Sequence, residues 1–234
     1  MSASLTQKRG IRSFVLRTGR LTSSQKRGFE QYWSHYGLEV ERGMIDAAAI
    51  FSRTAPLALE IGFGMGESLL TMAEQQPDWN FIGIEVHPPG VGRLLNQLAD
   101  KQLDNVRVYR EDALAVLNHC IADTSLSRLQ LYFPDPWPKK KHHKRRIVQS
   151  DFVALISKKL ATGGVLHMAT DWQAYAEHMI EVLSAPDLPF SNCAGESLYS
   201  ERPDFRPVTK FEQRGRRLGH GVWDLLFEKV ENSK

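Results

Sequence analysis

The pattern of hydrophobic and polar positions becomes regular from residue 56 onward. Short apolar runs of the β type occupy residues 57–62, 80–86, 105–112, 128–133 and 163–171. Between them, apolar residues recur at helical spacing over residues 66–76, 90–102, 113–122, 147–160 and 172–183. This alternation predicts an α/β fold in which a parallel sheet is covered by helices on both faces.

The two ends of the chain depart from this pattern. Residues 1–54 are predicted to be a basic N-terminal arm, in which residues 21–37 can form a short helix after a Thr or Ser cap. Residues 55–234 then make up the main domain. The last apolar run, 221–230, is predicted to be an edge strand near the C-terminus.

Composition narrows the class of protein. The chain has 234 residues and a hydrophobic fraction of 42%, which suits one α/β domain. No apolar run approaches the ~20 residues that span a bilayer, and the N-terminus lacks the apolar stretch of a signal peptide. Cys120 and Cys193 lie far apart, as expected for reduced thiols in a cytoplasmic protein.

Positive charge is unevenly distributed although the formal net charge is only +3. Residues 1–29 hold seven Lys or Arg and no acid, residues 139–146 hold six, and residues 202–217 hold six against two acids. Each cluster alone could serve solubility, but three together favour a polyanionic partner such as nucleic acid.

Acidic residues stand at or just beyond the ends of several of the predicted strands. In open α/β sheets ligands bind beyond the carboxyl ends of the strands, so these acids are expected to lie along the binding edge. They are Glu60, Glu85, Asp112, Asp135 and Asp171.

The turn after the first strand, Glu60-Ile-Gly62-Phe-Gly64-Met-Gly66, has the spacing GxGxG. The dinucleotide fingerprint is GxGxxG, and its third glycine would fall on Glu67. An acid beside a helix N-terminus suits a cationic or zwitterionic ligand better than a pyrophosphate.

The next two strand ends extend this picture. Glu85 can accept hydrogen bonds from ribose hydroxyls, and Asp112 can accept one from an adenine amine. A ribose, an adenine and a cationic amino-acid tail describe S-adenosylmethionine.

Together these motifs resemble the bacterial tRNA (guanine-N7)-methyltransferase family. The resemblance is carried by Glu60, GFGMG, Glu85, Asp112, FPDPWPKKKHHKRR (133–146), ATDW (169–172) and RPVTKFEQRG (206–215). It runs from residues 12–22 to residues 218–228, which is nearly the whole chain.

The resemblance implies a Rossmann-like class I methyltransferase fold with a mostly parallel seven-stranded sheet. It also implies S-adenosylmethionine as donor and the variable-loop guanine of tRNA as acceptor. The implied donor-site residues are Glu60, Gly62, Gly64, Gly66, Glu85, Asp112 and Asp135. The implied substrate contacts are Lys139, Asp171, Thr209, Lys210, Phe211 and Glu212.

Asp135 is the candidate catalytic residue. Pro134 and Pro136 restrict the backbone on both sides, so its carboxylate needs little reorganisation. Guanine N7 has a lone pair and no proton, so it can attack the methyl directly while Asp135 accepts from N1–H and N2–H and offsets the growing positive charge. Trp137 either stacks on the base or packs in the core. Phosphates are expected to contact Lys140, Lys141, Lys144, Arg145 and Arg146.

Other functions remain open at this point. Exocyclic-amine methyltransferases place Asp/Asn-Pro-Pro-aromatic after the fourth strand, whereas this chain has Asp135-Pro-Trp. The alternative that is not an enzyme is a protein that binds tRNA but does not methylate it.

His142 and His143 lack Cys or HExxH partners, so no metal is expected. His87, His167 and His220 are expected to be structural, and the protein to be a monomer or a homodimer.

Overall fold

The computed structural model describes residues 13–14, 20–209, 212–213, 215 and 221–231. The predicted alternation of strands and helices is confirmed over this part of the chain. In chain order the elements are α1 (Ser23–Tyr36), β1 (Gly37–Leu38), η1 (Val40–Arg42), α2 (Ala47–Phe51), β2 (Leu57–Ile61), α3 (Glu67–Gln75), β3 (Asn80–Ile84), α4 (Pro88–Asp100), β4 (Val106–Tyr109), α5 (Ala113–His119), β5 (Leu126–Tyr132), η2 (Lys140–Arg145), α6 (Ser150–Lys159), β6 (Leu160–Thr170), α7 (Gln173–Leu183), β7 (Phe190–Asn192) and β8 (Trp223–Lys229).

The described strands form one mixed sheet in the order β1-β4-β3-β2-β5-β6-β8-β7. The strands from β1 to β6 pair in parallel, and β8 pairs antiparallel with both β6 and β7. The sheet has eight strands rather than the seven expected. Six of the eight match the apolar runs of the sequence; the other two, β1 with two residues and β7 with three, carry too little alternation to be recognised from sequence.

The edge-strand prediction for residues 221–230 is wrong. β8 lies between β6 and β7, and its residues Asp224, Leu225 and Phe227 are buried. The outer position belongs to β7 because this short strand returns beside β8 through register pairs such as Ser191 with Glu228.

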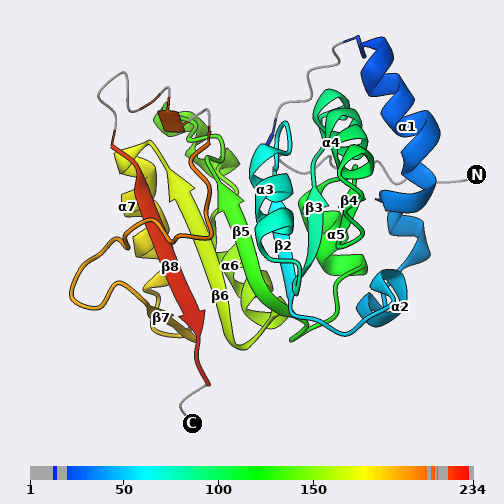
Figure 1. Cartoon of the computed structure of the whole chain (residues 1–234). Coiled ribbons are helices and arrows are strands. Elements are labelled where there is room, and N and C mark those ends of the chain that lie inside the picture. The colour runs from blue at the N-terminus through cyan, green and yellow to red at the C-terminus, as the bar shows by residue number, and fades with distance from the viewer. Residues whose placement is uncertain (1–12, 15–19, 210–211, 214, 216–220, 232–234) are drawn as a thin grey trace, which may run out of the picture.

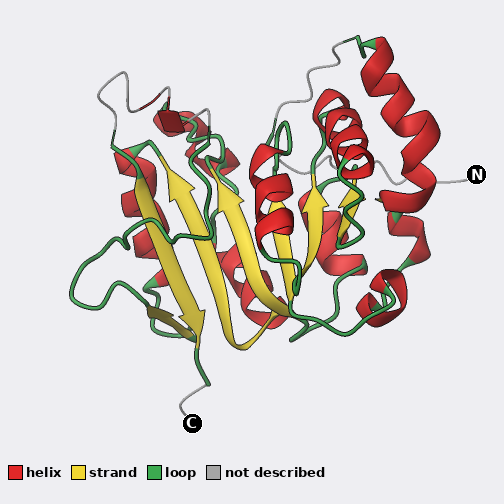
Figure 2. Cartoon of the chain, in the orientation of Figure 1, coloured by secondary structure: helices red, strands yellow, loops and turns green. Residues whose placement is uncertain are grey.

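Helices cover both faces of the sheet (Figures 1 and 2). One hydrophobic core lies under α5, α6 and α7, and the other lies under α1, α3 and α4. All five residues of β2 are buried, as expected for a central parallel strand packed on both faces. None of the described helices is long and apolar enough to cross a membrane.

Helix α1, which belongs to the predicted N-terminal arm, packs closely on α4 at positions occupied by glycine. Thr22 caps α1 in a capping box with Gln25, so the predicted helix and its Thr cap are confirmed. A Cβ on Gly28 would lie 2.2 Å from the carbonyl oxygen of Gly92, which shows that the backbones of α1 and α4 touch. The domain boundary at residue 54 stays a prediction.

Candidate functional site

A cavity of about 310 Å³ opens at the carboxyl ends of the central strands. This volume lies at the lower end of the range for small-molecule sites. Four of the residues predicted from sequence line it, namely Gly62, Glu85, Asp112 and Asp135. Apolar walls come from Phe14, Ile61, Ile84, Leu114, Leu131 and Ile147. The binding edge therefore combines acids with apolar surface, as a nucleoside ligand requires.

The glycine turn contributes Gly62 to the wall of this cavity. Gly62, Gly64 and Gly66 have φ angles of 72°, 58° and 80°, a region that L side chains rarely adopt. A Cβ on Gly90 would lie only 1.9 Å from the carbonyl oxygen of Gly64. The start of α4 therefore packs directly on the turn. Sequence reasoning missed Gly90, although a glycine directly after two prolines at a helix start was the available signal.

Backbone amides hold the carboxylate of Glu85 in place. The N–H of Gly64 donates to Oε2 at 2.8 Å, and the N–H groups of Val86 and His87 donate to Oε1 at 2.7 and 2.9 Å. Each carboxylate oxygen can accept more than one hydrogen bond, so Glu85 still has acceptor capacity toward the cavity.

Asp112 has two roles in the structure. Its Oδ1 accepts from the N–H groups of Leu114 and Ala115 at 2.8 and 3.3 Å, so it caps α5 at its N-terminus. The same residue lines the cavity. The helix thereby fixes the direction of the carboxylate.

Glu60 does not line the cavity, because it is buried between β2 and the first turn of α3. Ser68 Oγ donates to Glu60 Oε1 at 2.6 Å, and Oε2 has no hydrogen-bond partner among the described residues. Burial raises the pKa of Glu60 to about 7, against the opposing effect of the Ser68 hydrogen bond. A nearby cation would stabilise the ionised form. Sequence reasoning missed Ser68, which stands in the first turn of α3.

The Asp135 loop has a constrained backbone. Phe133 and Trp137 have φ angles of 49° and 44°, and the carboxylate of Asp135 is exposed between them. Trp137 belongs to neither hydrophobic core. Its Nε1–H donates to the carbonyl oxygen of Ser13 at 3.2 Å, and Arg145 lies over its ring. One face of the indole is therefore already covered, which neither interpretation from sequence expected.

The basic run divides into surface and interior residues. Lys139, Lys140, Lys141 and Lys144 are exposed, and Arg145 is half-buried. Arg146 is only 4% exposed, its Nε donates to the carbonyl oxygen of Pro136 at 2.9 Å, and its guanidinium lies over the Tyr175 ring. Arg146 was expected to contact RNA, but its side chain instead braces the Asp135 loop from inside.

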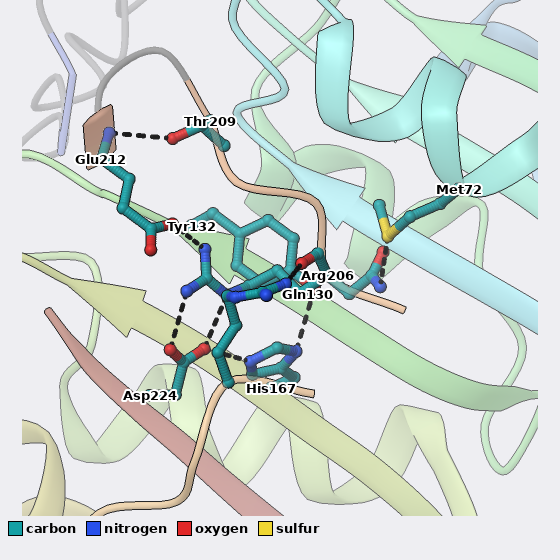
Figure 3. Close-up of polar contacts among 9 residues, drawn as sticks. Met72, Gln130, Tyr132, His167, Arg206, Thr209, Glu212 and Asp224 are labelled. Carbon is teal, nitrogen blue, oxygen red and sulfur yellow. Dashed lines mark hydrogen bonds and ion pairs between the residues drawn. The ribbon is translucent and has the colours of Figure 1, made fainter. Parts of the chain in front are cut away.

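Three of the remaining substrate candidates are among the described residues, namely Asp171, Thr209 and Glu212. Asp171 directly follows β6 and is half-buried. Thr209 Oγ1 accepts from the N–H of Glu212 at 3.1 Å, whereas the Glu212 carboxylate points inward to Arg206 (Figure 3). Lys210 and Phe211 lie outside the described residues. Among the residues described, no group of three or more His, Cys, Asp or Glu side chains is placed to hold a metal ion.

Three kinds of comparison identify relatives of this chain. A family model described as "Putative methyltransferase" matches residues 54–225. A tRNA (guanine-N(7)-)-methyltransferase of Alcanivorax borkumensis is 59% identical over 94% of this chain and 92% of that protein. Its counterpart in Saccharophagus degradans is 57% identical over 95% of this chain and 97% of that protein.

Solved structures share the fold at low sequence identity. An rRNA methylase from Streptococcus thermophilus matches with a TM-score of 0.51 and 11% identity, covering 76% of this chain and 88% of that one. An antibiotic-related methyltransferase matches with a TM-score of 0.52 and 14% identity, covering 82% and 94%. The predicted methyltransferase fold is thus confirmed, apart from the number of strands. With the identity to its curated relatives, the chain belongs to the tRNA (guanine-N7)-methyltransferase family.

Proposed function

We propose that this protein transfers a methyl group from S-adenosylmethionine to N7 of the variable-loop guanine in tRNA. The observation that carries the proposal is the convergence of Glu85, Asp112 and Asp135 on one cavity. Family membership gives the reaction, and the geometry supports a role for each residue.

The donor fits the residues present. Glu85 is held by three backbone amides in a position to accept from the ribose hydroxyls, and Asp112 to accept from the adenine amine. The unpartnered oxygen of Glu60 favours a cationic ligand nearby. Bound there, S-adenosylmethionine supplies an electrophilic methyl on its sulfonium centre.

Asp135 is the residue that would bind guanine, the acceptor of the methyl group. Its exposed carboxylate can accept from N1–H and N2–H of a guanine that enters from solvent. N7 then attacks with its lone pair, and no general base is needed because N7 carries no proton. The fixed negative charge stabilises the cationic base as it forms.

The tRNA backbone is held by the surface cations beside this loop. Lys139, Lys140, Lys141 and Lys144 are exposed, and phosphate contacts of this kind position a nucleic acid without reading its sequence. Asp171 and Thr209, with Lys210 and Phe211, complete the substrate side. We place the reaction in the cytoplasm and expect the protein to act as a monomer or a homodimer.

The direct test is methylation of bulk tRNA with labelled donor, followed by nucleoside mass spectrometry. The expected product is 7-methylguanosine, whose ring opens under alkaline treatment. A product methylated on an exocyclic amine would support the alternative enzyme class. Binding of tRNA and donor without labelled product, even in a single turnover, would support the non-catalytic alternative.

A further inference from the structure

A buried ion-pair cluster lies on the sheet beside the proposed site. Residues 200–209 cross β8 and β6 on the face that carries α3 and α4 (Figure 1). Arg206 points from this segment into the protein, and its side chain is fully buried. Its Nε and Nη2 donate to the two carboxylate oxygens of Asp224 at 2.7 and 2.8 Å, and its Nη1 donates to Glu212 Oε2 at 2.6 Å (Figure 3).

The cluster continues through two further buried side chains. His167 Nε2 lies 2.8 Å from Asp224 Oδ1, and His167 Nδ1 lies 3.0 Å from the Tyr132 hydroxyl. Burial lowers the pKa of His167, although the Asp224 carboxylate opposes that effect. Burial also raises the pKa of Tyr132, so the phenol keeps its proton. Tyr132 therefore donates to Nδ1 of a neutral imidazole, and Nε2–H donates to Asp224.

The two ends of this chain of contacts lie next to residues that are proposed above to contact the substrate. Tyr132 is the last residue of β5, and the Phe133-Pro134-Asp135 loop follows directly. At the other end, Glu212 is tied by its own backbone N–H to Thr209. Arg206 lies between them, with its guanidinium carbon 5.9 Å from the ring centroids of both Tyr132 and Phe133.

Burial of this cluster is not explained by stability alone. Removing charged groups from water is costly, and apolar side chains of similar volume often stabilise a core as well or better. A guanidinium held by two carboxylates in fixed geometry does, however, define the relative position of the segments it joins. The cluster joins the segment containing Thr209 to strands β5, β6 and β8.

We propose that Arg206 is a positioning residue for methyl transfer, acting through Asp224, His167 and Tyr132 to hold Thr209 and Glu212 in register with Asp135. This inference rests on the function proposed above. It gives Glu212 a different role from the one predicted by sequence: its carboxylate anchors Thr209 and its neighbours to Arg206.

The test compares Arg206→Lys with Arg107→Lys in the full chain. Lys keeps the charge but cannot bridge both oxygens of Asp224 while reaching Glu212. Arg107 is the matched control because its guanidinium also donates to three acceptors, the carbonyl oxygens of Asp104, Val106 and Ile50, and it stands on β4, toward the opposite edge of the sheet. Single-turnover rates at saturating tRNA and donor, donor Kd and thermal unfolding are measured for both.

Arg206→Lys is expected to slow single-turnover transfer at least tenfold while donor Kd stays within about twofold. Arg107→Lys is expected to keep the wild-type rate even where its melting temperature falls equally. A folded Arg206→Lys protein with the wild-type rate would overturn the inference. Wild-type protein that forms no 7-methylguanosine would instead refute the proposed function itself.

A second comparison separates positioning from general destabilisation. In the Asp135→Asn background, Arg206→Lys is expected to change the rate less than twofold, because the Asp135 carboxylate with which it keeps Thr209 in register is already absent. Fully additive losses would overturn the inference. Where Arg206→Lys does not fold, Tyr132→Phe decides the matter, since it removes only the hydroxyl bonded to His167. We expect it to slow transfer at least threefold, and an unchanged rate would count against the proposal.

Discussion

The guanidinium carbon of Arg145 lies 3.9 Å from the centroid of the Trp137 ring. This stack brings the loop that presents Asp135 into direct contact with the basic 3-10 helix η2, which carries phosphate-binding candidates. Trp137 thus stacks with the Arg145 guanidinium, in addition to donating a hydrogen bond to Ser13.

The first prediction follows from that stack. Cation–π contacts of this kind are worth about 0.5–2 kcal/mol. Trp137→Ala should therefore lower kcat/KM for tRNA by roughly two- to thirtyfold. Trp137→Phe keeps a ring under Arg145 and should show less than half of that effect on the free-energy scale. An equal decrease in both variants would assign the role to the indole N–H instead.

Glu60 leads to a prediction about pH and stability. Its pKa of about 7 in the folded protein lies above the ordinary value of 4.5, so the unfolded chain loses this proton first as pH rises. The free energy of unfolding should fall between about pH 4.5 and 7, by about 3 kcal/mol, and this decrease should be absent from Glu60→Gln. Urea unfolding of both proteins at several pH values measures it. Parallel pH curves would show that Glu60 titrates normally.

Glu85 should matter more for the donor than for tRNA. Glu85→Ala removes the acceptor for three backbone amides and for the ribose, so we expect donor binding to weaken by about 1.5–3 kcal/mol, which raises the donor Kd roughly ten- to 150-fold. Titration of the demethylated donor product measures this affinity. tRNA affinity in the absence of donor serves as the control and should change less than twofold.

Asp135→Asn tests the acceptor side. The substitution preserves size but replaces one acceptor oxygen by an NH₂ that faces the donor edge of guanine. We expect most of the single-turnover rate to disappear while tRNA affinity, set by phosphate contacts, changes little. A rate equal to that of the wild type in Asp135→Asn would remove Asp135 from the mechanism.

The exposed lysines should govern the salt dependence of tRNA binding. Replacing Lys140, Lys141 and Lys144 by Gln should reduce the slope of log K against log salt by about 0.7–0.9 for each phosphate that the protein then leaves unneutralised. Lys101→Gln is the control, because Lys101 follows α4 at the end opposite the glycine turn, roughly 20 Å away. A slope unchanged in the triple variant would show that the run is a solvated surface.

Local pattern determined much of this protein. The alternation of apolar runs predicted the order of strands and helices, because each parallel strand needs a helix to return. Acids placed at or shortly after strand ends predicted Glu85, Asp112 and Asp135 as neighbours, since the carboxyl ends of parallel strands share one edge. These inferences depend on short segments, and a sequence displays short segments directly.

Contacts between distant segments were decided only by the tertiary structure. β8 became an inner strand because the three residues of β7 pair along its outer side. Arg146 turned inward to Pro136 and Tyr175 although it closes a run of surface cations. Arg206 and Asp224 are 18 residues apart and form an ion pair that the sequence around either residue does not predict. The sequence gives the charge of a side chain. Whether that charge contacts water, a phosphate or a buried partner depends on which strands the fold places beside it.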